Sequence, residues 1–211
     1  MYISSRIDCA PTARAIPMPS QLALSRLALM SVLLAFAACE SAPPAPRALL
    51  NENTAVTLTI VAAPLLFARV RYVTTDAGHD FATLVAVEKD EAGKYTDLLL
   101  LYRWSIPSYG GSPAPEESAG RLLIQADGHE IELQPLELMP IDLSRRKELF
   151  LPERVDVVMH AYATDFETMR LMAMSHDLTL RVSQDPLDAP FWLWRDGRPA
   201  LALFVKQLSG S

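Results

Sequence analysis

The chain of 211 residues lacks most of the patterns that mark a catalytic or metal site. It has four histidines and two cysteines, and none of them falls into the C-x-x-C, H-x-x-x-H or H-E-x-x-H spacings of metal sites. No G-x-S-x-G motif is present, so nothing signals the nucleophile elbow of a serine hydrolase. We therefore expect no catalytic residue, no metal ligand and no cofactor.

A long apolar run and an excess of positive charge are missing as well. The longest uncharged apolar stretch, residues 27–38, has 12 residues, whereas a membrane-spanning helix needs about 20. Three of the 19 Lys and Arg residues and one of the 25 Asp and Glu residues precede Cys39, which leaves 16 basic and 24 acidic residues after it. Such an acidic chain repels phosphate backbones, so we expect no nucleic-acid partner.

What the sequence does contain at its start is typical of an export signal. Arg26 precedes the apolar run, and small residues close it, which are the marks of a signal peptide over residues 1–38. A signal this compact fits a start at Met18 better than one at Met1.

The stretch "FAAC" ending at Cys39 resembles the lipobox of bacterial lipoproteins, and this resemblance covers about residues 18–47 only. It departs from the usual pattern at Phe36, where Leu is commonest. The resemblance implies that the Cys39 thiol carries a diacylglyceryl group, that the signal is cut before Cys39, and that the new amino terminus is acylated, with palmitate among the chains. Glu40, in place of Asp, implies the outer membrane. The competing interpretation is cleavage after Ala37 at "AFA", which gives a soluble periplasmic protein.

Two neighbouring features favour lipidation. Cys39 is the sole cysteine after the signal, so it has no partner for an internal disulfide. Pro43, Pro44 and Pro46 follow it, and proline-rich segments of this kind act as extended spacers. We expect residues 39–50 to be a lipidated cysteine followed by a tether, with a single domain over residues 51–211.

The pattern of that domain predicts a mainly β fold, an antiparallel β-sandwich or a barrel-like domain with one short helix. Alternating or apolar segments bounded by turn residues predict strands at 54–61, 81–88, 95–104, 121–125, 131–136, 155–163, 178–182, 191–194 and 199–208. Asp90 and Gly93 predict a hairpin loop between the strands at 81–88 and 95–104. Asp127-Gly128 and Asp196-Gly197 are type I′ turn signals, so each is predicted to close a hairpin. Thr164 and Glu167 form a capping-box pattern, which predicts a helix of about eleven residues.

Histidines are the remaining candidates for chemistry. His79, His129 and His176 each precede an acidic residue, but neighbours on a strand point to opposite faces and form no chelate. His160 shares a predicted strand face with Asp156, but four strand residues span about 13 Å, too far for a hydrogen bond. We expect His160 at a surface or sheet edge.

Trp192 and Trp194 form a possible binding surface. They alternate with Phe191 and Leu193, so one pair is expected in the core and the other could bind a sugar ring, a peptide or a protein. The alternative is that both faces are covered, or that the tryptophans pack under the Gly- and Pro-rich loop at residues 105–120.

Together these features predict a monomeric envelope lipoprotein, held in the outer membrane by its lipid anchor and facing the periplasm. Its role would be binding or structural, with an envelope protein or a glycan as partner. The alternatives are a soluble exported binding module, or a hydrolase with a site near the 105–120 loop.

Overall fold

The computed structural model describes residues 43–52, 54–73, 76–106, 120–139, 149–150, 157–183, 185 and 189–210, without the side chains of 71–77. The expected signal peptide, Cys39 and residues 107–119 of the long loop lie outside the described residues. No helix among the described residues is long and apolar enough to cross a membrane.

The described part of the chain is mainly β, as predicted. It forms ten strands and two helices: β1 Arg47–Asn51, β2 Val56–Ile60, β3 Leu65–Val73, β4 Asp76–Glu91, β5 Lys94–Ile106, β6 Leu122–Ala126, β7 His129–Leu133, β8 Val158–Ala163, α2 Phe166–Met174, β9 Leu178–Val182, β10 Phe191–Arg195 and α3 Arg198–Leu208.

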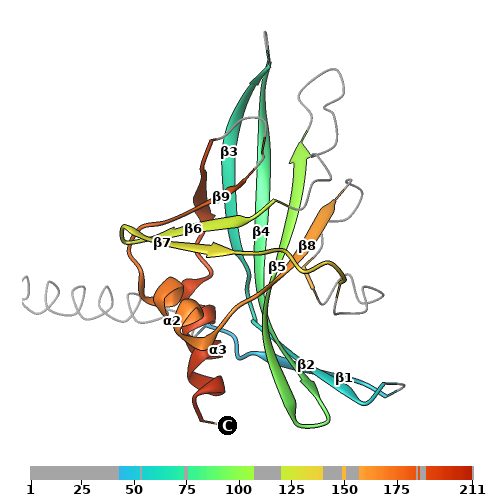
Figure 1. Cartoon of the computed structure of the whole chain (residues 1–211). Helices are drawn as coiled ribbons and strands as arrows, with labels where there is room; N and C mark the ends of the chain where they lie inside the picture. The colour runs from blue at the N-terminus through green and yellow to red at the C-terminus, as the bar shows by residue number, and fades with distance from the viewer. Residues whose placement is uncertain are drawn as a thin grey trace, which may run out of the picture. The chain divides into compact units, whose positions relative to one another are not determined.

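All ten strands belong to one antiparallel sheet organised around β4 (Figure 1). One edge of β4 pairs with β5, which continues to β8. The other edge pairs with β2 and then with β3. From β3 the sheet continues through β10, β9, β6 and β7, and β1 extends it beyond β2. The sheet is not closed into a barrel; a single bridge, Pro135 to Tyr162, links the segment after β7 to β8.

Two predicted hairpins are confirmed, and their turns explain the register. β4 and β5 turn at Ala92 and Gly93, with φ of 54° and 84°, and the Gly93 amide donates to Asp90 Oδ1 at 2.8 Å. β6 and β7 turn at Asp127 and Gly128, with φ of 48° and 83°. Positive φ at both central residues is the type I′ geometry that suits the twist of paired strands.

The predicted strand at 199–208 is wrong, because this segment is helix α3. Its buried residues Ala200, Leu201, Phe204 and Val205 recur every three or four positions, which is the helical period. Gly197 precedes the helix with φ of −99°, so it does not form the predicted type I′ turn. Pro199 lies in the first helical turn, where its missing N–H costs nothing.

The predicted helix near Thr164 is present as α2, but its cap is one residue later than the capping-box pattern suggests. Asp165 is the N-cap, and its Oδ1 accepts a hydrogen bond from the Thr168 amide at 2.7 Å.

Two strands, β1 and β3, were not predicted. β3 contains Arg69 and Arg71, which interrupt the apolar pattern, and β1 includes residues 47–50 of the expected tether.

Both faces of the sheet carry buried side chains, and the two helices pack on one of them. Leu65, Leu84 and Leu99 on neighbouring strands surround a small void together with Met172 of α2 and Leu201 of α3. We call this side of the sheet the helix face and the other side the opposite face. Paired residues share a face, so the register assigns the paired strand residues between β10 and β8 to one of the two.

Candidate functional site

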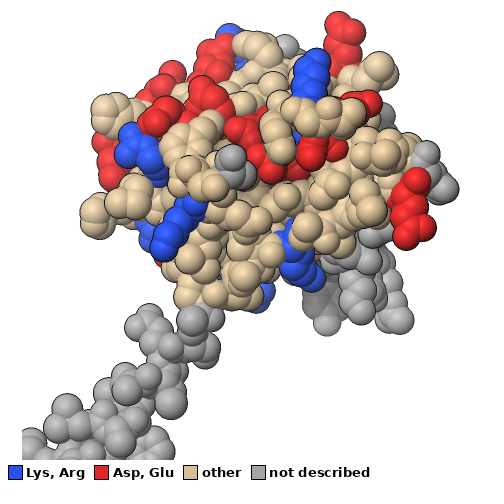
Figure 2. Space-filling model, turned by 90° about the horizontal axis from the view of Figure 1, so that it is seen from below, with Lys and Arg blue, Asp and Glu red and all other residues tan. Residues whose placement is uncertain are grey.

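Acidic side chains gather on one side of the domain. Figure 2 shows Asp and Glu concentrated along one half of the surface seen from below, while the other half is mostly uncharged. Among the described residues, Glu88 is repelled by Asp97 and Asp90, and Asp97 is repelled by Asp165. These four carboxylates come from β4, β5 and the start of α2.

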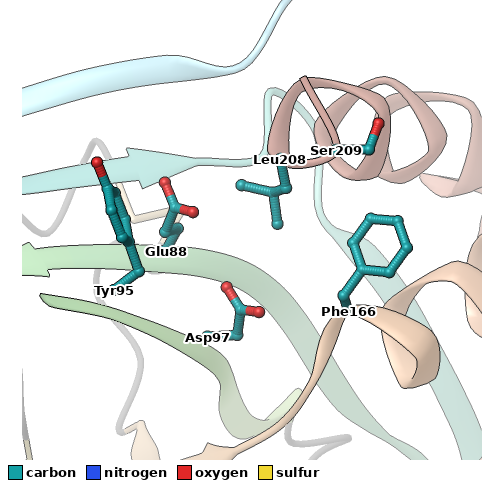
Figure 3. Close-up of a pocket in the computed structure, with 6 residues that line it drawn as sticks. All are labelled: Glu88, Tyr95, Asp97, Phe166, Leu208 and Ser209. Atoms are coloured by element: carbon teal, nitrogen blue, oxygen red, sulfur yellow. The ribbon is translucent and has the colours of Figure 1, made fainter. Parts of the chain in front are cut away.

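A pocket of about 520 Å³ opens beside Glu88 and Asp97. It is lined by Glu88, Tyr95, Asp97, Phe166, Leu208 and Ser209. Figure 3 shows the two carboxylates directed into the same space, with Leu208 and Phe166 beside them and Tyr95 at the side. The pocket therefore combines two acids with an apolar wall contributed by both helices.

The hairpin register brings the two carboxylates together. Glu88 and Asp97 are partners across β4 and β5, so their Cβ atoms are about 4.5–5.5 Å apart. Both lie on the helix face, as do Leu84 and Leu99 further along the strands. The Thr164 amide donates to the Asp97 carbonyl at 3.0 Å, which fixes the start of α2 beside β5 and places Phe166 at the pocket.

Both carboxylates hold their protons more tightly than usual. Burial raises the pKa of Glu88, and the neighbouring charges of Asp97 and Asp90 raise it further. Burial also raises the pKa of Asp97, and Asp165 adds to the effect. Among the described residues, no basic side chain forms an ion pair with either carboxylate; Lys89, the nearest in sequence, pairs with Glu91 at 2.7 Å.

The sequence analysis missed this pair, although the signal was present. A turn at Ala92 and Gly93 pairs residues whose numbers sum to 185, so Glu88 must face Asp97. What the sequence could not show is that two helices enclose the helix face at this level.

Comparison with known proteins finds no match for this chain. The chain matches no protein-family model. Searches of curated proteins and of solved structures give no match either.

The structure places Trp192 and Trp194 on the surface. They are 59% and 67% exposed, whereas Phe191 is buried and Leu193 is partly buried. Trp192 pairs with Ala68 and lies on the opposite face. The pairing with β3 shifts between Leu193 and Arg195, so Trp194 occupies an irregularity that simple alternation does not describe.

Trp192 begins a row of side chains across the opposite face. The register continues from Trp192 through Ala68 to Phe81 and Trp104. Phe81 and Trp104 stack with ring centroids 4.3 Å apart, and the Trp104 Nε1 donates to Thr83 Oγ1. Because the stacked rings face each other, Trp104 is partly covered, unlike Trp192.

A buried charged network lies on the helix face, away from the pocket. Arg69 donates to Asp80 at 3.2 Å and to Asp185 at 3.0 Å, and its guanidinium lies over the Phe191 ring at 4.2 Å. Arg103 lies 3.7 Å from Asp185, and the side chains of all four charged residues are less than 10% exposed. The network ties the segment before β10 to β3, which is a structural role.

The histidines do not converge. His79, His129 and His176 are exposed, and the amides of His176 and Asp177 donate to the Asp127 carboxylate. Within the described ranges, no three His, Cys, Asp or Glu side chains are grouped as metal ligands would be.

His160 lies on β8, which pairs with β5 alone among the named strands, and it is partly buried. Burial lowers its pKa, and the positive charge of Arg103 lowers it further. Asp156, which shares a predicted strand face with His160, lies outside the described residues, as does Cys39. Ser105 lies near the end of β5 and donates to the buried Asp80 at 2.7 Å.

Proposed function

We propose that this chain is an envelope lipoprotein, anchored through Cys39, whose periplasm-facing β domain binds an organic cation with an apolar part. The observation that carries the binding role is the pair Glu88 and Asp97, two partly buried carboxylates without an ion-pair partner in the described chain, at the wall of a pocket. The lipobox resemblance supports the location.

The chemistry of the pocket indicates the ligand class. Like charges directly opposite each other on a sheet are destabilising, so a cation between Glu88 and Asp97 would relieve a repulsion that the folded domain contains. Phe166, Leu208 and the Tyr95 ring supply apolar contact for the rest of the ligand. Two carboxylates fall short of the six to eight oxygens that a calcium ion takes, which favours an ammonium group over a metal ion.

Binding is tested with three probes of one shape and different charge. The mature chain with Cys39→Ala, which needs no detergent, is titrated with phenethylammonium, 3-phenylpropionate and 2-phenylethanol by calorimetry. We expect the ammonium compound to bind most tightly and the carboxylate to bind least. Equal binding of all three, or no binding of the ammonium compound, would contradict the proposal.

The carboxylates are tested with matched variants. Glu88→Gln and Asp97→Asn should each weaken phenethylammonium binding several-fold, since each removes one charge from the cation's surroundings. Glu91→Gln is the control, because Glu91 lies three residues along the same strand and is already paired with Lys89. A loss of affinity in the control as large as in Glu88→Gln would assign the effect to overall charge.

The anchor is tested separately. Intact-mass analysis of the mature protein should show a chain that begins at Cys39 and carries acyl chains there. Each buried methylene contributes about 0.8 kcal/mol, so several chains resist a salt wash. Cys39→Ala should move the protein out of the membrane fraction or stall its processing. An unmodified terminus at Ala38 would support the soluble periplasmic alternative instead.

A further inference from the structure

The four carboxylates beside the pocket form a series in which each repels the next. In order, they are Asp165, Asp97, Glu88 and Asp90. Backbone amides hold the two outer members. Asp165 Oδ1 accepts a hydrogen bond from the Thr168 amide at 2.7 Å, and Asp90 Oδ1 accepts one from the Gly93 amide at 2.8 Å. The outer members are therefore negative charges in fixed positions on either side of the inner pair.

The inner pair, Glu88 and Asp97, has no such support. Within the described ranges, neither carboxylate accepts a hydrogen bond or forms an ion pair. The two residues are cross-strand partners, and their carboxyl groups point into one space (Figure 3). When two carboxylates share a site, one of them keeps its proton to a higher pH. The inner pair is therefore where this pocket takes up a proton.

The groups that face the pair supply no positive charge. The titratable ones are Asp90 of β4, Tyr95 of β5 and Asp165 at the start of α2. From β2, Thr59 lies opposite Glu88, and α3 adds Leu208 and Ser209 to the pocket. These contributions are acidic, hydroxylic or apolar.

The basic side chains of the neighbouring elements are engaged elsewhere or lie outside the pocket. Lys89 follows Glu88 on β4, so it points to the opposite face, where it pairs with Glu91 at 2.7 Å. Arg170 of α2 pairs with Glu167 at 2.6 Å. Lys206 of α3 is exposed and does not line the pocket. Positive charge at the inner pair therefore comes from solution, as a proton or as a bound cation.

We propose that Glu88 and Asp97 exchange a proton for the organic cation, so that the pair without ligand shares one proton at mildly acidic pH and cation binding releases it to water. The inference rests on the proposed cation-binding function. In the exchange, one carboxyl O–H bond breaks, the proton passes to water, and the ammonium group takes its place between two carboxylates. The domain would hold its ligand at neutral pH and release it where the surroundings turn acidic.

Proton release is measured directly by calorimetry. Phenethylammonium is titrated into the Cys39→Ala chain at pH 5, 6, 7 and 8, each time in two buffers of different ionisation enthalpy, and the difference in heat counts the protons. We expect almost no release at pH 8 and a release approaching one proton per ligand at pH 5. The affinity should fall by up to about tenfold per pH unit at the acidic end, as linkage requires for one proton.

Two variants outside the pocket lining assign the proton to the pair. Asp90→Asn and Asp165→Asn each remove a charge that raises the pKa of an inner carboxylate, and asparagine still caps α2. Both should shift the fall in affinity to lower pH. Glu91→Gln removes the same charge from the opposite face of β4, where Glu91 pairs with Lys89, so it should leave the pH profile in place.

The outcomes separate the exchange from the binding function. If phenethylammonium binds without releasing a proton at any of these pH values, the exchange is wrong and the cation site stands. If the compound does not bind at pH 8, the function fails and the exchange fails with it. If Asp90→Asn and Asp165→Asn leave the pH profile unchanged, or if Glu91→Gln shifts it equally, the proton is not held by this pair.

Discussion

Glu88 and Asp97 lie directly opposite each other on β4 and β5, and the two helices cover the same face of the sheet. The described part of the chain therefore keeps two like charges together in a partly buried place, with no basic side chain paired to either. This arrangement has consequences for stability that can be measured without knowing the ligand.

Glu88→Gln should stabilise the domain at neutral pH. Like-charged cross-strand pairs cost about 0.2–1 kcal/mol, and the partial exposure of Glu88 to solvent puts the gain toward the lower end of that range. The measurement is urea denaturation of the Cys39→Ala chain at pH 7.

The pH dependence of that gain has a defined sign. Because folding raises the pKa of Glu88 above its ordinary 4.5, the folded state binds a proton more tightly than the unfolded state. The penalty is therefore absent at low pH, develops as the pH rises from the ordinary pKa of 4.5 toward the raised pKa, and is complete above it. The advantage of Glu88→Gln should shrink at pH 4. Glu91→Gln is the control and should give no gain, since Lys89 lowers the pKa of Glu91.

Breaking the buried network of Arg69, Asp80 and Asp185 should lower the free energy of unfolding. Arg69→Met leaves Asp80 and Asp185 buried without their shared cation, and removal of one partner from a buried ion pair costs about 3–5 kcal/mol. Asp80→Leu should also destabilise. The double variant should lose less than the sum, because it removes the pair together. Strict additivity in urea denaturation would show that the pair is not coupled.

Gly197 should be intolerant of a side chain for reasons of space alone. Its φ of −99° is accessible to any residue, but a Cβ would meet the Pro64 carbonyl oxygen at 2.3 Å. Gly197→Ala should therefore cost about 1–3 kcal/mol, as overpacking does. Gly210→Ala is the control, since its nearest neighbour would be at 3.8 Å. Equal melting temperatures for the two variants would contradict the close packing of Gly197 against Pro64.

Neighbouring aromatics of β10 should differ in their effect on stability. Phe191 is fully buried beneath the Arg69 guanidinium, so Phe191→Ala should cost about 3–5 kcal/mol. Trp192→Ala and Trp194→Ala remove side chains that are mostly exposed, and each should cost on the order of 1 kcal/mol or less. Thermal unfolding of the three variants tests this, and a large loss from either tryptophan would place it in the core.

Local signals in the sequence were sufficient for the fold class and for several elements. Strand alternation predicted β2 and β9, and the turn chemistry of Asp127-Gly128 predicted the β6–β7 hairpin. These predictions hold because positive φ and a period of two are properties of a few adjacent residues. The same local reasoning failed at 199–208, where an Asp-Gly pair precedes a helix whose apolar residues face the sheet.

Charge inside the sheet was a second source of error. Arg69 interrupts the pattern of β3, and its buried charge is compensated by Asp80 and Asp185, 11 and 116 residues away. A sequence cannot show partners so distant, because nothing local records which strand lies beside which.

The sequence by itself determined a pattern typical of an export signal, the place of Cys39 before a proline-rich stretch, the mainly β class, and the facing of Glu88 and Asp97 once their turn is placed. The tertiary structure alone decided that both helices enclose that pair and that Trp192 and Trp194 are exposed. The physical reason is the same in each case. Residue chemistry and turn geometry act over a few positions, whereas burial and proximity depend on which distant strands and helices pack together.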